Sequence, residues 1–298
     1  MLQDIVLATI TPFDKQNKID FKSNEKLLEF WRNGGINTFF ICGTCGEMMS
    51  LSIDERKSLI DFYTQSKKDN EHICVHIGGT SVQNIIELAN YSESKNADSV
   101  CIVTPNYYKI SQEELIEYFG NILKNIPNKE VYLYNIPQCT GLDLLPESLS
   151  TLSNEFPQIA GIKYSFFDFN RIHKYLYVNP KKIRVLSGTD HMLVGLISSG
   201  VKGIISGIGC VYPDIFINLL NAFKQHNQEE VMILQEFAIE IAEIMEYGYI
   251  PIFKEALAYK GFCEPYCRNP YQPMSDIQKK SLIEKLNSWE KRLNKAVN

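Results

Sequence analysis

The segment Ile159-Ala160-Gly161-Ile162-Lys163-Tyr164-Ser165 contains a short apolar run that predicts a β-strand ending in a lysine. About thirty residues earlier, Tyr132-Leu133-Tyr134-Asn135-Ile136-Pro137 predicts a second strand, which ends in a polar aromatic residue. Burial disfavours the charged form of an amine, and the neutral amine is the form that attacks a carbonyl. A lysine nucleophile beside a phenol that can carry protons suggests Schiff-base chemistry on neighbouring strands.

The same strand pattern repeats outward from this pair along most of the chain, and amphipathic helical stretches separate the repeats. The expected strands are Ile5–Ile10, Thr38–Cys42, Ile73–Ile77, Val100–Thr104, Val131–Asn135, Ile159–Lys163, Ile183–Leu186 and Gly203–Ser206. Eight β-α units over about 225 residues match a parallel (β/α)8 TIM barrel in number and length. A doubly wound sheet is the alternative, but Gly43-Thr44-Cys45-Gly46-Glu47 is not the G-x-G-x-x-G loop that it would need.

Helix start signals support this alternation. Ser52 with Glu55, and Ser111 with Glu114, form capping boxes. The expected helices are Arg56–Thr64, Val82–Ser94, Glu114–Lys124 and Asp214–Lys224, and then Val231–Glu246, Pro251–Tyr259 and Ser275–Leu293. We therefore expect a barrel over residues 1–225 and a C-terminal helical extension over residues 226–298.

Composition excludes some classes of protein. The 298 residues are 45% hydrophobic, with a net charge of −5 and a pI of about 5.7. No basic block indicates a nucleic-acid or membrane-surface partner, and no run of about 18 apolar residues indicates a membrane span. The first residues, Met1 to Asp4, lack a secretory pattern, and the eight cysteines are scattered. We expect reduced thiols and a cytoplasmic location.

Three cysteine and histidine groupings raise the question of a metal. Cys42 with Cys45 and Cys263 with Cys267 are close pairs, but more than 200 residues separate the two. His72, Cys74 and His76 share one face of a strand by alternation, and simple packing near the strand end explains them. We therefore expect no metal and no cofactor.

Unusual residues end or follow the expected strands, at the end of the barrel where barrel enzymes carry their active sites. They are Gly43 to Glu47, Thr104 to Tyr108, Tyr134 with Asn135, Lys163, Ser187 to Asp190, and Ser206 to Gly209. A glycine-flanked turn such as residues 43–46 can present backbone N–H groups to a carboxylate.

Together, these motifs resemble the dihydrodipicolinate synthase and N-acetylneuraminate lyase family of class I pyruvate aldolases. Gly43 to Glu47 resembles the family's G-[ST]-T-G-E loop, Tyr134 to Pro137 its Y-N-x-P, and Gly161 to Lys163 its G-[IV]-K. The resemblance runs from residues 9–13 to residues 268–270 and so covers nearly the whole chain.

The resemblance implies a role for each catalytic candidate. Lys163 would form an imine with the C2 carbonyl of pyruvate, and Tyr134 would carry protons. Thr44, with the backbone N–H groups of its loop, would hold the pyruvyl carboxylate or assist the relay. Tyr107 would reach into the relay of a neighbouring subunit of a homotetramer. The partners would be small molecules, pyruvate and an aldehyde or sugar acid.

Departures from the family pattern bear on the substrate. Cys139 stands where the synthase has the arginine that binds its second substrate's carboxylate. Neuraminate lyases are similar at residues 163–165, 187–190 and 266–270, but differ at His191 and at residues 206–208. The expected substrate-binding residues are Cys45, Ser165, Gly188, Thr189, Asp190, Ser206 and Gly207.

We therefore expect a lyase that reversibly cleaves a 2-oxo-3-deoxy sugar acid, with N-acetylneuraminate first. A 2-keto-3-deoxygluconate aldolase is the alternative. A 4-hydroxy-tetrahydrodipicolinate synthase, an imine-forming dehydratase and a non-catalytic sugar-acid-binding barrel stay open.

Overall fold

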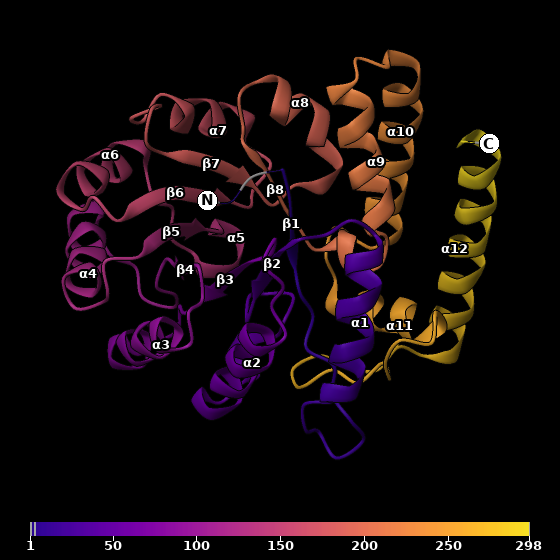
Figure 1. Ribbon diagram of the computed structural model, residues 1–298, viewed down its shortest axis with the longest axis horizontal. Helices are drawn as coiled ribbons and strands as arrows, with labels where there is room; N and C mark the ends of the chain where they lie inside the picture. The colour runs from indigo at the N-terminus through magenta and orange to yellow at the C-terminus, as the bar shows by residue number, and fades with distance from the viewer. Residues whose placement is uncertain (1, 3, 298) are drawn as a thin grey trace.

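The computed structural model describes residue 2 and residues 4–297, and its centre is a closed barrel of eight parallel strands in sequence order (Figure 1). The strands are β1 Asp4–Ala8, β2 Thr38–Ile41, β3 His72–His76, β4 Ser99–Val103, β5 Glu130–Asn135, β6 Ile159–Tyr164, β7 Arg184–Ser187 and β8 Gly203–Ser206. Pairing of Asp4 with Gly203 closes the ring. The predicted TIM barrel is confirmed, and each predicted strand lies within two residues of the observed one.

Helices surround the barrel, and most strands are followed by at least one (Figure 1). They are α1 Phe21–Asn33, α2 Ile53–Gln65, α3 Val82–Ser94, α4 Gln112–Lys124, α5 Pro137–Thr140, α6 Pro146–Glu155, α7 Phe169–Leu176, α8 Leu193–Ser198 and α9 Pro213–Lys224. Three 3-10 turns lie at strand ends: η1 Met48–Ser50, η2 Asp190–Met192 and η3 Ile208–Cys210.

Both predicted capping boxes are present, but the helix starts predicted after them were wrong. Ser52 accepts from the N–H of Glu55, and the Glu55 carboxylate accepts from the N–H of Ser52. Because the capping serine directly precedes the first helical residue, α2 begins at Ile53 rather than at Arg56. For the same reason α4 begins at Gln112 rather than at Glu114.

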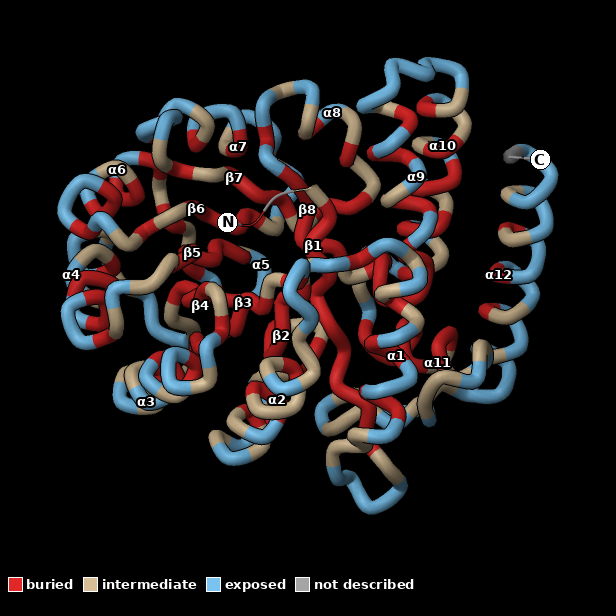
Figure 2. Tube along the Cα trace, viewed as in Figure 1, coloured by how far each residue is buried: buried red, intermediate tan, exposed pale blue. Residues whose placement is uncertain are grey.

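The core has two layers. One fills the barrel and includes Phe40, Cys101, Tyr132 and Tyr134. The other lies between the strands and the surrounding helices. Figure 2 shows the strands buried along their length and the outward faces of the helices exposed. A filled barrel leaves only its ends for a site, and Tyr134, Lys163 and Ser206 lie at the carboxyl ends of their strands.

Three more helices, α10 Gln228–Ile244, α11 Ile250–Tyr259 and α12 Asp276–Val297, lie on one side of the barrel (Figure 1). Helix α10 packs against α9 and α12. Trp289 of α12 is buried, and its ring lies 4.7 Å from that of Tyr212 and 5.9 Å from that of Phe237. The outer core layer thus continues into these helices. In the part of the chain that the structure describes, no helix has the length and apolarity needed to cross a membrane.

Candidate active site

A cavity of about 410 Å³ opens at the carboxyl ends of the strands. Residues from the ends of β5 and β6, from the loops after β2, β7 and β8, and from the turn between α10 and α11 line it. Nine of the predicted site residues lie on its wall: Thr44, Cys45, Tyr134, Lys163, Ser165, Gly188, Thr189, Asp190 and Gly207. Residues that are scattered in sequence therefore meet in one place.

Lys163 and Tyr134 are neighbours across β6 and β5, where they face each other in the strand register. The Nζ atom of Lys163 lies 4.2 Å from the centroid of the Tyr134 ring and 4.4 Å from that of Phe40. Only 4% of Lys163 is exposed, and no ion-pair partner for it occurs among the described residues. Two aromatic rings rather than a carboxylate thus hold this amine at the cavity wall.

Thr44 lies at the same place on the loop that follows β2. Its hydroxyl is 3.4 Å from the Tyr134 hydroxyl. Hydrogen bonds inside the loop use the N–H groups of Gly46, Glu47 and Met48, and within the described chain those of Thr44 and Cys45 donate to no backbone carbonyl. Free N–H groups in a turn suit a carboxylate ligand.

Cys45 is a wall residue rather than a nucleophile. Burial raises the pKa of its thiol to about 11, against the weaker opposing effect of the Lys163 charge. A thiol with that pKa stays protonated at neutral pH, and the thiolate is the reactive form.

The loop is anchored from behind by a buried ion pair that sequence reasoning missed. Lys254 of α11 lies 2.5 Å from a carboxylate oxygen of Glu47, and both side chains are fully buried. Lys254 also donates to the carbonyl of Tyr266, and the N–H of Arg268 donates to Glu47. The available signal was a lysine inside the apolar stretch Ile250–Tyr259, the same kind of anomaly that marks Lys163.

Asp190 lies on the cavity wall in η2, just after β7. One carboxylate oxygen accepts from the Ser206 hydroxyl at 2.9 Å and from the N–H of Ile208 at 3.0 Å. The other oxygen is buried without a hydrogen-bond partner among the described residues. Burial raises the pKa of Asp190 to about 6, although these hydrogen bonds oppose the shift. Ser206 lies behind Asp190 and does not line the cavity.

Gly188 and Thr189 lie in the loop that follows β7, and each packs closely against a neighbouring serine. A side chain at Gly188 would collide with the hydroxyl of Ser165, so this position allows Ser165 to stay on the wall. The Thr189 hydroxyl is 2.5 Å from that of Ser187, which already occupies part of its hydrogen-bonding capacity.

Tyr107 is the catalytic candidate that the chain does not bring to the cavity. Its side chain is 89% exposed, its φ is +76°, and its ring packs edge-on against Tyr108. It lines a separate shallow hollow together with Met49 and Cys139. Within one chain, therefore, Tyr107 does not join Lys163 and Tyr134.

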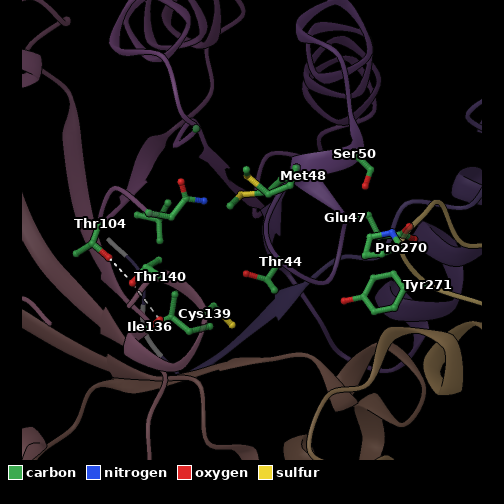
Figure 3. A pocket seen from close by; sticks show the side chains of 14 residues that line it. Thr44, Glu47, Met48, Ser50, Thr104, Ile136, Cys139, Thr140, Pro270 and Tyr271 are labelled. Atoms are coloured by element: carbon green, nitrogen blue, oxygen red, sulfur yellow. Dashed lines mark hydrogen bonds between the residues drawn. The ribbon is translucent and has the colours of Figure 1, made fainter. Parts of the chain in front are cut away.

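A second cavity of about 250 Å³ adjoins the first and shares Thr44, Ile136 and Cys139 with it. Figure 3 shows it between the 44–50 loop, the Thr104–Thr140 hydrogen bond and Tyr271. No arginine lines either cavity in the described part of the chain, and Cys139 is exposed where the two meet.

The histidines of β3 do not form a ligand set. His72 bonds the Ser99 hydroxyl at 2.8 Å, whereas His76 is buried against the rings of Phe40 and Tyr134. Burial lowers the pKa of His76 well below its ordinary value, so the ring is neutral. Among the described residues, no group of three or more His, Cys, Asp or Glu side chains is placed to hold a metal ion.

Comparison with known proteins matches this chain to one family along nearly its whole length. The model of the dihydrodipicolinate synthetase family matches residues 1–288. A 4-hydroxy-tetrahydrodipicolinate synthase of Hydrogenobaculum sp. (strain Y04AAS1) is 30% identical over 292 residues, which cover 96% of this chain and 99% of that protein. The synthase of Thermosipho africanus (strain TCF52B) is 31% identical over 290 residues, covering 96% and 98%.

Solved structures agree with the sequence relatives. YagE, an Escherichia coli K12 prophage protein of the dihydrodipicolinic acid synthase family solved in complex with pyruvate, superposes with a TM-score of 0.92 at 25% identity over 97% of this chain and 99% of that one. The dihydrodipicolinate synthase of Aquifex aeolicus gives 0.90 at 25% identity over 97% and 98%.

Proposed function

The chain belongs to the dihydrodipicolinate synthetase family, and we propose that it uses Lys163 to cleave, reversibly, a 2-oxo-3-deoxy sugar acid to pyruvate and an uncharged aldehyde. It is a carbon–carbon lyase of the Schiff-base class. N-acetylneuraminate is the first candidate substrate, and 2-keto-3-deoxygluconate is the next.

The chemistry begins with the Lys163 amine. Its lone pair attacks the C2 carbonyl, the Tyr134 hydroxyl gives its proton to the departing water, and a protonated imine and a Tyr134 phenolate remain. The C4 hydroxyl then gives its proton to the Tyr134 oxygen, the C3–C4 bond breaks, and its electron pair moves into the enamine. The aldehyde leaves, C3 takes up a proton, and water hydrolyses the imine to release pyruvate and the free amine.

The geometry supports this order of events. Tyr134 lies between the Lys163 amine and the Thr44 hydroxyl, so one phenol is in reach of both the imine and a proton relay. The N–H groups of Thr44 and Cys45 point to a place for the pyruvyl carboxylate.

The preference for an uncharged aldehyde rests on one observation. Among the described wall residues Lys163 is the only lysine or arginine, and the reaction uses it up as the imine. The remaining polar groups include the Asp190 carboxylate, which accepts hydrogen bonds from hydroxyl groups. An anionic aldehyde would meet Asp190 without a cation to balance it.

A 4-hydroxy-tetrahydrodipicolinate synthase is the second candidate, because the relatives described above carry that name. In the family pattern, the synthase's second substrate is clamped by an arginine, and here the position is Cys139. A bidentate carboxylate clamp cannot be made by a thiol.

One assay separates the candidates. Pyruvate is supplied with N-acetylmannosamine, glyceraldehyde or aspartate semialdehyde, and kcat/KM is measured for each condensation. We expect the two hydroxylated aldehydes to be used in preference to the semialdehyde, because a site built on hydrogen bonds rejects ligands that lack them. Preference for the semialdehyde would instead establish the synthase.

A further inference from the structure

Three aromatic rings from distant parts of the sequence meet on the wall of the Lys163 cavity. Phe167 follows β6, His191 follows β7, and Tyr247 lies in the turn between α10 and α11. Their ring centroids are 5.7 Å apart for Phe167 and His191, 6.0 Å for Phe167 and Tyr247, and 5.1 Å for His191 and Tyr247. These three residues are called the aromatic cluster below.

Exposure places this cluster at the mouth of the cavity. Lys163 and Asp190 are each only 4% exposed, whereas Phe167 is 56% and Tyr247 54% exposed. The wall thus runs from buried polar groups at its base to open aromatic surface at its rim. Exposed aromatic surface beside a cavity is typical of a place where a ligand packs.

The backbone that presents Tyr247 is held in an unfavourable conformation. Glu246 and Tyr247 have φ values of +47° and +50°, and Gly248 follows at +120°. Left-handed backbone is disfavoured for residues with side chains, and for a bulky aromatic residue it is uncommon. This left-handed turn ends helix α10, where the N–H of Tyr247 donates to the Ala242 carbonyl and the N–H of Glu246 to the Glu243 carbonyl. The end of α10 therefore fixes where Tyr247 stands on the cavity wall.

Charge narrows the kind of ligand. Burial lowers the pKa of His191 below its ordinary value, so its ring is neutral at neutral pH. Two acids lie beside the cluster: Glu246 on the cavity wall, and Glu243, whose charge acts on His191. This rim therefore disfavours an anionic group and suits one that offers hydroxyls to a carboxylate and C–H groups to ring faces.

We propose that the aromatic cluster is a subsite for the far end of the aldehyde half, so that the enzyme prefers uncharged hydroxylated aldehydes longer than glyceraldehyde. Phe167 and Tyr247 are its specificity-determining residues. The inference rests on the proposed function, because it assumes that pyruvate is bound at Lys163.

The test compares condensation of pyruvate with N-acetylmannosamine and with glyceraldehyde in the wild type and in Tyr247→Ala, Phe167→Ala and Tyr247→Phe. The two alanine variants are expected to lower kcat/KM for N-acetylmannosamine by roughly 3- to 10-fold, as loss of one aromatic contact predicts, and to leave glyceraldehyde unchanged. Tyr247→Phe keeps the ring, so its ratio of kcat/KM for N-acetylmannosamine to kcat/KM for glyceraldehyde should equal that of the wild type.

Tyr177→Ala is the matched control. It removes an exposed tyrosine whose ring also packs against a histidine, 5.5 Å from His173, but which does not line the cavity. The ratio of kcat/KM for the two aldehydes should be the same in this variant as in the wild type.

Each failure has its own signature. Equal losses for both aldehydes, or no use of N-acetylmannosamine by a wild type that still forms the pyruvate imine, would overturn the subsite and leave the pyruvate chemistry standing. Failure to trap pyruvate on Lys163 would overturn the proposed function, and the subsite with it.

Discussion

Tyr134 is the residue on which the proposed proton transfers depend, since its ring touches the Lys163 amine and its hydroxyl faces Thr44. Replacement by phenylalanine keeps the ring against the amine and removes only the proton carrier. Positioned acid–base groups contribute roughly 100- to 10,000-fold to rate. Tyr134→Phe should lose turnover in that range and still form the imine with pyruvate, although more slowly.

Tyr132→Phe is the control for this variant. Tyr132 is two residues earlier on β5 and is also buried inside the barrel, but its hydroxyl accepts from the N–H of Leu2. Its loss should cost about 1 kcal/mol of stability and little turnover. An unchanged turnover number in Tyr134→Phe would exclude the role given to it.

Asp190 predicts a pH dependence for the sugar half of the substrate. Because burial raises its pKa to about 6, the carboxylate becomes protonated as the pH falls through that value. With about a tenth of it ionised at pH 5, kcat/KM for the sugar acid should fall about tenfold between pH 7 and pH 5. Borohydride trapping of pyruvate should change less over that range.

The direction of the Asp190 pKa shift separates the predicted fall in kcat/KM from acid unfolding. A carboxyl group whose pKa is higher in the folded chain binds its proton more tightly there, so this group favours the folded state increasingly as the pH falls from 6 towards 3.8. Asp190→Asn has no proton to gain and should flatten this part of the profile. A profile that Asp190→Asn leaves unchanged would assign the titration to another group.

At the level of elements, the loop of residues 43–50, which we propose binds the pyruvyl carboxylate, contacts a helix from the far end of the chain. Lys254 of α11 and Glu47 form an ion pair away from solvent, and Phe13 lies beneath both Lys254 and Arg268, 4.1 Å and 4.3 Å from their charged groups. Glu47 itself has a left-handed φ of +56°. The loop's shape is therefore fixed by contacts outside the barrel's own strands.

Lys254→Met should leave the Glu47 charge buried and unpaired, which typically costs 3–5 kcal/mol, so the thermal midpoint should fall. The KM for pyruvate should also rise, because the N–H groups of Thr44 and Cys45 lose their support. Adding Glu47→Gln should recover part of the lost stability, because it removes the buried charge that Lys254→Met leaves unpaired. Additive losses in the double variant would show that the two residues act independently.

The sequence located these elements better than it located their contacts. Alternating apolar runs and serine caps are local signals, and they predicted eight strands to within two residues. The partnership of Lys254 with Glu47, more than 200 residues apart, has no local signal that names both partners. For the same reason, the meeting of Phe167, His191 and Tyr247 was not foreseen.

At the scale of the whole molecule, the barrel gathers strand ends that are distant in sequence into one cavity. The placement of Lys163, Tyr134 and Thr44 together followed from the fold, because barrel enzymes use that end. Ser206 shows the limit of such reasoning: it ends β8 as predicted, but its hydroxyl donates to Asp190. A strand position gives the end of the barrel but not the direction of a hydroxyl.

Tyr107 lies away from the Lys163 cavity of its own chain. It extends from the barrel with most of its surface exposed and a left-handed backbone, so its proposed role in the relay requires a neighbouring copy of the chain. The sequence therefore predicts which residue takes part, but a contact between Tyr107 and the relay could form only between two copies of the chain.

Every step proposed above begins with an imine on Lys163, and borohydride in the presence of pyruvate traps that imine without a second substrate. The intact chain should gain one reduced pyruvate adduct, and peptide mapping should place it on Lys163. Lys163→Met, with the amine removed, should gain none. An adduct on any other lysine, or no adduct on the wild-type chain, would contradict the account.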